Sequence, residues 1–262
     1  YDKAMFEEAG VTDVPTTWDE FLDVCQKVKD AGYNPLTCNS DSVNLLYGFQ
    51  LARYIGQDAV LDCFNNSNWA NVPEAKKAAE DIATLVDNGY FSPNAPAQYP
   101  DGQNEIGFGE SCMVLNASWI PNEILQNTGE EVDFGFFPWP SVEGGVDGAE
   151  ASMVGAQGFG INKESDMQQE AFDFATMIAT GDYDLEMASS VNSIPADTDN
   201  TEWPDAIAAA EPYFKEMTKA YDWAVGLETN PDFTPIINEN VVKLIQGDIT
   251  PDDFIAALAA AQ

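Results

Sequence analysis

The sequence lacks histidine altogether, and only 10 lysines and arginines stand against 45 aspartates and glutamates. Without histidine, a Ser-His-Asp triad, a Cys-His dyad and a histidine-ligated zinc site are excluded. The formal net charge of −35 repels nucleic-acid backbones and anionic membrane surfaces, so neither is an expected partner. No apolar run approaches the roughly 20 residues that a membrane-spanning helix needs.

Cysteine is scarce and widely spaced, and no pair has the C-x-x-C spacing of a zinc knuckle or a thioredoxin-type redox site. Cys25 falls on the apolar face of an expected helix, and Cys38 and Cys112 fall in expected strands. We therefore expect buried free thiols, with at least one disulfide as the alternative. The four cysteines concerned are Cys25, Cys38, Cys63 and Cys112.

The 262 residues are 45% apolar, which is enough to bury a substantial core. Thr17 and Glu20 form a capping-box pattern that opens the clearest helix, and Phe172, Ala175 and Ile178 are expected to face inward from a later one. Helices are predicted over 17–31, 45–55, 73–87, 165–181, 203–224 and 235–246, with a last one after Thr250; strands over 35–39, 112–116 and 134–137; and a long loop over 90–109. Because helices and short strands alternate, the predicted fold class is α/β.

Several motifs follow one another in the order of a known family. Residues 1–10 (YDKAMFEEAG) and 15–21 (PTTWDEF) are followed by 109–119 (GESCMVLNASW), 133–140 (DFGFFPWP), 158–163 (GFGINK) and 170–174 (EAFDF). Together they resemble the extracellular solute-binding proteins of bacterial ABC sugar importers, in the maltose-binding-protein-like group. The first two stretches match the family pattern nearly residue for residue, and the resemblance covers essentially the whole chain.

The resemblance implies a periplasmic-binding-protein-like two-lobed fold, of which this chain forms mainly the C-terminal lobe. Residues 1–153 are expected to form the first part of that lobe, 154–202 to cross back to the N-terminal lobe, and 203–262 to complete the C-terminal lobe. The missing N-terminal lobe and a lipoprotein signal are expected to precede Tyr1. The implied activity is non-catalytic: capture of a sugar or oligosaccharide by hinge closure, without a cofactor or metal, and delivery to the membrane subunits of an ABC transporter. The implied location is extracellular, as a cell-surface lipoprotein or a periplasmic protein.

A sugar presents C–H faces and a rim of hydroxyls, so its site needs aromatic platforms and amides or carboxylates. The family motif implies that Trp119 stacks on the sugar, whereas Trp18 lies on the apolar stripe of a capped helix and is expected in the core. Glu123 and Asp222 are possible acceptors for sugar hydroxyls. The residues expected to contact the ligand are Trp119, Asn39, Asp41, Asn44, Tyr47, Trp139, Gln157 and Trp223.

Two other classes of function remain open at this point. A glycoside hydrolase needs only a pair of carboxylates about 5–9.5 Å apart, and 45 acidic residues supply many such pairs. A calcium-dependent adhesin would suit the acidity, although no D-x-D-x-D-G loop is present.

Overall fold

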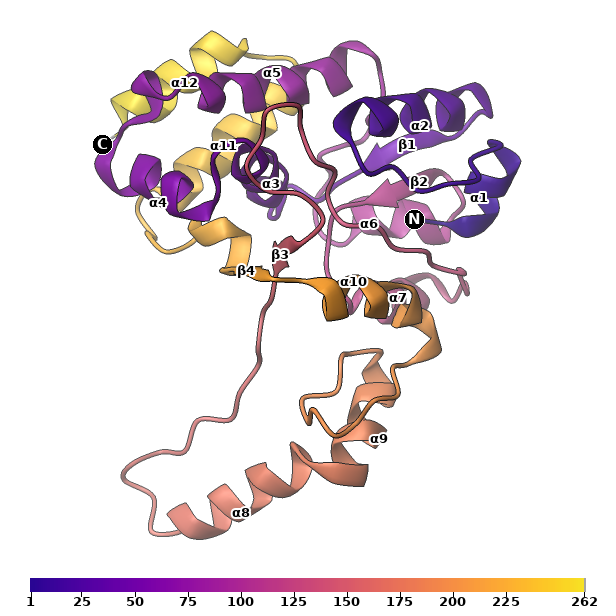
Figure 1. Ribbon diagram of the computed structural model, residues 1–262, viewed down its shortest axis with the longest axis vertical. Helices are drawn as coiled ribbons and strands as arrows, with labels where there is room; N and C mark the ends of the chain where they lie inside the picture. Colours follow the sequence, from indigo (N-terminus) through magenta and orange to yellow (C-terminus); the bar gives the residue numbers. More distant parts are fainter. Residues whose placement is uncertain (262) are drawn as a thin grey trace.

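The computed structural model describes residues 1–261 and shows a main body with a long segment that extends below it (Figure 1). We call residues 154–202 the arm. The chain leaves the body in an extended stretch, turns through two helices and returns to the base of the body.

One half of the main body is built around a short parallel pair of strands. Strand β1 (Asn34–Thr37) pairs with β2 (Ser111–Val114), with Leu36 opposite Met113. Around this pair lie α1 (Lys3–Glu8), α2 (Trp18–Asp30), α6 (Asp101–Gly107) and α7 (Ile120–Thr128). The predicted capping box of α2 is confirmed.

The other half of the body is helical. The helices are α3 (Val43–Ile55), α4 (Gln57–Asn66), α5 (Pro73–Asp87), α11 (Thr234–Ile245) and α12 (Pro251–Ala260), with a 3-10 turn η1 (Trp69–Asn71). Helix α3 is buried along nearly its whole length, because α4, α5 and α11 pack around it. One continuous apolar core runs through both halves.

A second parallel pair of strands joins the body to the arm. The chain leaves through β3 (Ala151–Met153) and returns through β4 (Lys219–Tyr221). Between them come α8 (Gln168–Ile178), α9 (Gly181–Val191), η2 (Asp205–Ala210) and α10 (Glu211–Glu216), and η3 (Trp223–Gly226) follows β4.

Arg53 fastens this strand pair to the core. Its fully buried guanidinium donates to the Trp139 carbonyl at 3.0 and 2.8 Å, to the Ala151 carbonyl at 3.0 Å and to the Tyr221 hydroxyl at 3.2 Å. The Tyr221 hydroxyl in turn donates to Asp147 at 2.8 Å, and Lys219 pairs with the same carboxylate. Since a buried charge must be paired, this network fixes the point where both strands emerge.

The structure corrects several sequence predictions. The loop expected over 90–109 contains helix α6, whose buried Gln103, Asn104 and Glu105 hide its helical pattern. Residues 134–137 form no strand: Phe134 makes one bridge to Asp2, and the prolines that follow lack the N–H groups that would extend it. Helix α4 and strand β3 were not predicted, and the helix expected over 203–224 is divided among η2, α10, β4 and η3.

The arm differs most from expectation. Phe172, Ala175 and Ile178 were predicted to face inward, but α8 buries none of its residues. Helix α9 packs against α8 and leaves Ala175 and Ile178 half-buried, but Phe172 is 56% exposed and its neighbour Phe174 is 57% exposed. The prediction of free thiols is confirmed, since none of the four cysteines is paired.

Candidate functional site

Two tryptophans from distant parts of the chain stack where the body faces the arm. Trp119 lies between β2 and the first residue of α7, and Trp223 is the first residue of η3, two residues after the end of β4. Their ring centroids are 5.8 Å apart and the planes meet at 20°. Trp119 is partly exposed and Trp223 is 39% exposed, so the pair presents aromatic surface to solvent.

A cavity of about 220 Å³ adjoins this pair. Its walls come from the end of β2, from residues 134–139, from β3 and from the segment that returns from the arm, including Ile207 and Phe214. Most of the lining is apolar, with Asn116 and Ser118 among its polar members, and no lining side chain is charged. The cavity therefore offers dispersion contacts and neutral hydrogen-bonding groups, but no ion-pair partner.

Hydrogen bonds and the local backbone conformation fix the orientation of the Trp223 indole. Its Nε1 donates to Glu228 at 2.7 Å, and the other oxygen of that carboxylate accepts from Asn44 Nδ2 at 2.8 Å. The backbone after Trp223 is left-handed at Ala224 (φ 49°) and at Val225 (φ 55°), which is costly for a β-branched residue. Strain of this kind persists only where the surroundings impose it, so Trp223 has a preset orientation.

A series of hydrogen-bonded polar side chains, which we call the relay, leads to the same face of the body. Asn39 Nδ2 donates to Gln103 Oε1 at 2.9 Å, and Gln103 Nε2 donates to Glu123 at 2.8 Å. Glu123 also lies against the Tyr99 hydroxyl, and its negative charge raises the pKa of Tyr99. Tyr99 is 48% exposed and Asp41 is exposed, so this relay ends in groups that solvent and ligands can reach.

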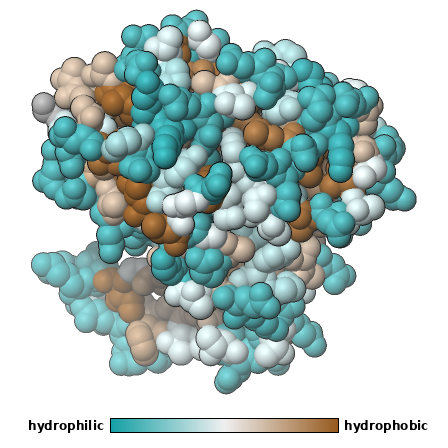
Figure 2. Space-filling model, turned by 45° about the horizontal axis from the view of Figure 1, so that its top comes forward, coloured by the Kyte–Doolittle hydropathy of each residue, from teal (hydrophilic) through white to brown (hydrophobic). Residues whose placement is uncertain are grey.

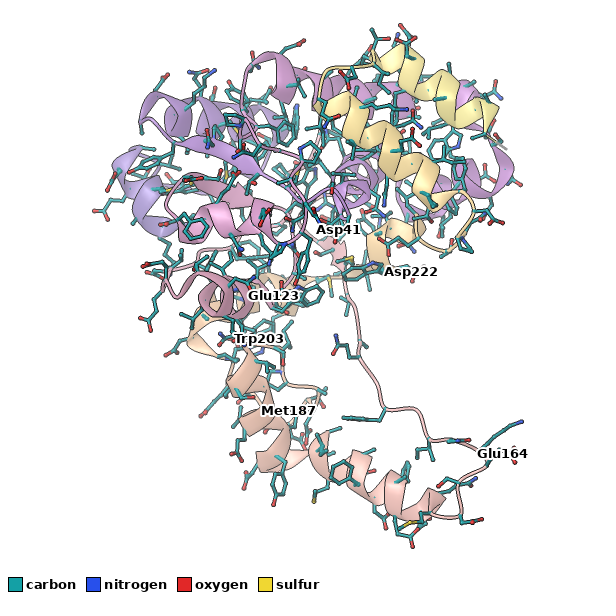
Figure 3. The ribbon with its side chains drawn as sticks, turned by 180° about the vertical axis from the view of Figure 1, so that it is seen from behind. Asp41, Glu123, Glu164, Met187, Trp203 and Asp222 are labelled. Carbon is teal, nitrogen blue, oxygen red and sulfur yellow. The ribbon has the colours of Figure 1, made fainter. Side chains whose placement is uncertain are left out.

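The acidic members of the site lie in the lower part of the body. Figure 3 shows Asp41, Glu123 and Asp222 along the underside of the body, above Trp203 and Met187 of the segment below. One oxygen of Asp222 is already engaged, since it accepts from Gln57 at 3.1 Å. Figure 2 shows a hollow between the body and the part below it, with hydrophobic residues on its lower side.

The structure does not bring every predicted contact residue to this place. It corrects the expectation for Tyr47, which is fully buried, donates to the Ala75 carbonyl and packs edge-on against Phe254 at 4.8 Å. Trp139 is only 6% exposed and donates to Gln50 at 2.7 Å, so it belongs to the core and forms part of the cavity wall. Gln157 is exposed in the extended stretch of the arm.

The remaining predicted residues fall into two groups. Trp119, Trp223 and Asp41 are accessible on the face just described. Asn39 and Asn44 are buried at 2% and 0% exposure and reach the site through Gln103 and Glu228. Sequence reasoning missed Tyr99, Gln103 and Glu228, because single polar residues in irregular or short elements leave no periodic signal.

Within residues 1–261 no three acidic or cysteine side chains gather as ligands for a metal ion. The Glu123 carboxylate accepts from Gln103 and lies against the Tyr99 hydroxyl. In the same part of the chain no helix is long and apolar enough to cross a membrane.

Comparisons with known proteins give the family and the fold. The family model for bacterial extracellular solute-binding proteins matches residues 1–183. A binding protein of Brucella abortus is 24% identical over 177 residues, which is 65% of this chain and 40% of that protein. The chain thus spans less than half the length of this curated relative.

Two solved structures share the fold over nearly the whole chain. A chitin oligosaccharide binding protein superposes with a TM-score of 0.82 at 22% identity, covering 99% of this chain and 67% of that one. The solute-binding protein RafE in complex with raffinose gives a TM-score of 0.74 at 19% identity, covering 99% and 68%. The α/β prediction and the periplasmic-binding-protein-like fold are thereby confirmed. Because the family model matches well over half of its residues, this chain belongs to the bacterial extracellular solute-binding proteins.

Proposed function

We propose that this protein captures a sugar or oligosaccharide and delivers it to an ABC importer, and that it catalyses no reaction on its ligand. The observation that carries the proposal is the Trp119–Trp223 pair beside an uncharged cavity and a polar rim. Aromatic faces stack on the C–H faces of sugars, and the rim from Asp41 to Glu123 supplies acceptors for hydroxyls. The chitin oligosaccharide binding protein and the complex of RafE with raffinose, both named above, support the sugar class.

The arm fits the proposal as part of a second lobe. On this view residues 1–153 and 203–262 form the C-terminal lobe, and 154–202 cross to the N-terminal lobe. The exposed apolar side chains of α8 support it, since contiguous exposed apolar surface is normally covered by a partner. Strands β3 and β4 are then the hinge, and Arg53 anchors the hinge to the body.

Hydrogen exchange tests this lobe assignment. The amides of residues 168–178 should exchange fast in the 262-residue chain, and slowly in the protein as its gene encodes it if further residues there supply a covering lobe. Slow exchange of this helix in the 262-residue chain would mean that α8 needs no outside partner and that the assignment is wrong.

The remaining parts of the proposal concern the protein's partners and its location in the cell. The partners are the membrane subunits of an ABC transporter, and the family description supports an extracellular or periplasmic location. A lipid anchor on the mature protein is the further expectation from the resemblance. Fractionation of source cells, with globomycin to block lipoprotein processing, tests it: an unprocessed precursor must accumulate.

The test of the central proposal is direct. Native mass spectrometry of the protein as its gene encodes it, incubated with raffinose, N,N′-diacetylchitobiose, xylobiose and erythritol, should show adducts with saccharide masses. Reducing-end assays on the same samples should show no hydrolysis. A protein that forms no adduct with any saccharide, or one that releases reducing ends, refutes the proposal.

A further inference from the structure

The charges around the candidate site are all of one sign. Asp222 precedes Trp223, and Glu228 accepts the Trp223 indole N–H. On the other side, Asp41 and Glu123 both raise the pKa of Tyr99 through their negative charge, which places both carboxylates near that hydroxyl. Two of these carboxylates therefore lie beside Trp223, a third, Glu123, lies one helical turn after Trp119, and no side chain that lines the adjoining cavity is charged.

No basic side chain of residues 1–261 lines the cavity, and the basic side chains nearest to it already have partners. Arg53 stands behind Trp139, but it is fully buried and its donors go to Trp139, Ala151 and Tyr221. Lys219, in the strand that leads to Trp223, pairs with Asp147. Lys215, next to the lining residue Phe214, pairs with Glu211 at 2.6 Å.

The other lysines lie elsewhere. Lys3 pairs with Asp133, Lys76 with Asp252 and Lys243 with Glu239, and Lys163 is exposed far along the arm. Lys77 stands over the Tyr54 ring, and Lys29 donates to the Asn88 carbonyl. Among the described residues, none of the ten basic side chains lines the cavity.

We propose that the site is specific for uncharged saccharides and discriminates against acidic ones such as uronic-acid, sulfated or phosphorylated sugars. This inference rests on the proposed sugar-binding function and deepens it by naming the ligand class. A ligand carboxylate bound at this rim would meet charges of its own sign, lose part of its hydration and gain no counter-ion from the side chains of residues 1–261. Specificity of this kind is achieved by repulsion as well as by attraction.

A matched set of three ligands tests the discrimination. Of raffinose and N,N′-diacetylchitobiose, the one that binds better in the mass-spectrometric panel is compared with its C6-carboxylate, made by oxidising a C6 primary alcohol, and with the corresponding C6-amide. The amide has nearly the shape of the carboxylate without its charge, so their ratio of dissociation constants isolates the charge effect. Calorimetric titration in 20 mM salt should show the carboxylate at least about tenfold weaker than the amide, which is about 1.4 kcal/mol.

Salt and variants identify the source of the discrimination. In 0.5 M salt the ratio should fall toward one, because screening shortens the reach of the rim charges. The double variant Asp41→Asn/Glu123→Gln should reduce the ratio about threefold or more in 20 mM salt. Asp87→Asn, which removes one negative charge at the exposed end of α5, is the control and should leave the ratio unchanged.

The outcomes separate the inference from the function on which it rests. If neutral saccharides bind and the carboxylate binds as well as the amide, the function stands and the discrimination is refuted. The same holds if the ratio is large but unaffected by the double variant and by salt. If no saccharide of the panel binds at all, the proposed function itself fails, and the inference fails with it.

Discussion

Replacement of Trp119 by alanine should weaken saccharide binding while leaving the fold largely intact. The side chain is partly exposed, lines the cavity and has one neighbouring aromatic ring, Trp223, at 5.8 Å. Loss of one stacking face costs about 1–3 kcal/mol of affinity, or roughly 5- to 150-fold in the dissociation constant. The melting temperature should change little, because few buried contacts are lost.

Trp18 provides the matched comparison. It is 8% exposed and packs between Phe21 at 5.3 Å and Trp139 at 5.9 Å. Trp18→Ala should therefore lower the free energy of unfolding by about 3–5 kcal/mol, the usual cost of emptying a large core site. The affinity of whatever fraction remains folded should stay near the wild-type value.

Calorimetric titration and urea unfolding of both variants decide the matter. If Trp119→Ala unfolds the protein while Trp18→Ala loses affinity and not stability, the stacking assignment of Trp119 is refuted. Trp223→Ala and the double variant complete a cycle: because the two rings touch, their effects on affinity should not add.

Three further predictions concern stability and reactivity. The four thiols should react with Ellman's reagent far more slowly in the folded protein than in urea. The reason is that burial raises the pKa of Cys38 and Cys112 to about 12 and that of Cys63 to about 11. Rapid reaction of the thiols in the native state would contradict this burial. The melting temperature should rise between 10 and 300 mM NaCl, because salt screens the self-repulsion of a chain with net charge −35, and a flat salt dependence would count against it. Thr17→Ala should cost about 1 kcal/mol in urea unfolding through loss of the α2 capping box, and Thr250→Ala should cost a similar amount at α12; a negligible loss in both would show that the caps contribute nothing.

The capped, amphipathic helices could be predicted from sequence because their signals are local. In α2 and α5 the first-turn residues and the apolar spacing agree, and the structure has both helices within a residue or two of the predicted bounds. Helix α6 could not be predicted, because it buries two polar residues, Gln103 and Glu105. Gln103 accepts a hydrogen bond from Asn39, and Glu105 accepts hydrogen bonds from Ser92 and Ser111. Such a helix is recognised only when its distant partners are known.

In the candidate site, too, some residues could be predicted from local sequence and others depend on contacts between distant segments. Trp119 was identifiable because a family motif surrounds it, and Trp223 because aromatic residues cluster there. Their contact joins residues 104 positions apart through the pairing of β3 with β4, which leaves no trace in either local sequence. Tyr47 was misplaced because a loop-proximal tyrosine in a helix looks the same whether the helix lies at the cleft or, like α3, in the centre of the core.

The measurement that tests the central claim most directly is a crystal structure of the protein as its gene encodes it, with the tightest-binding neutral saccharide of the panel. The account predicts a pyranose or furanose ring lying against Trp119 or Trp223, with its hydroxyls within hydrogen-bonding distance of the rim formed by Asp41, Tyr99 and Glu123. A saccharide bound away from both indoles, with these residues unchanged from the ligand-free state, would contradict it.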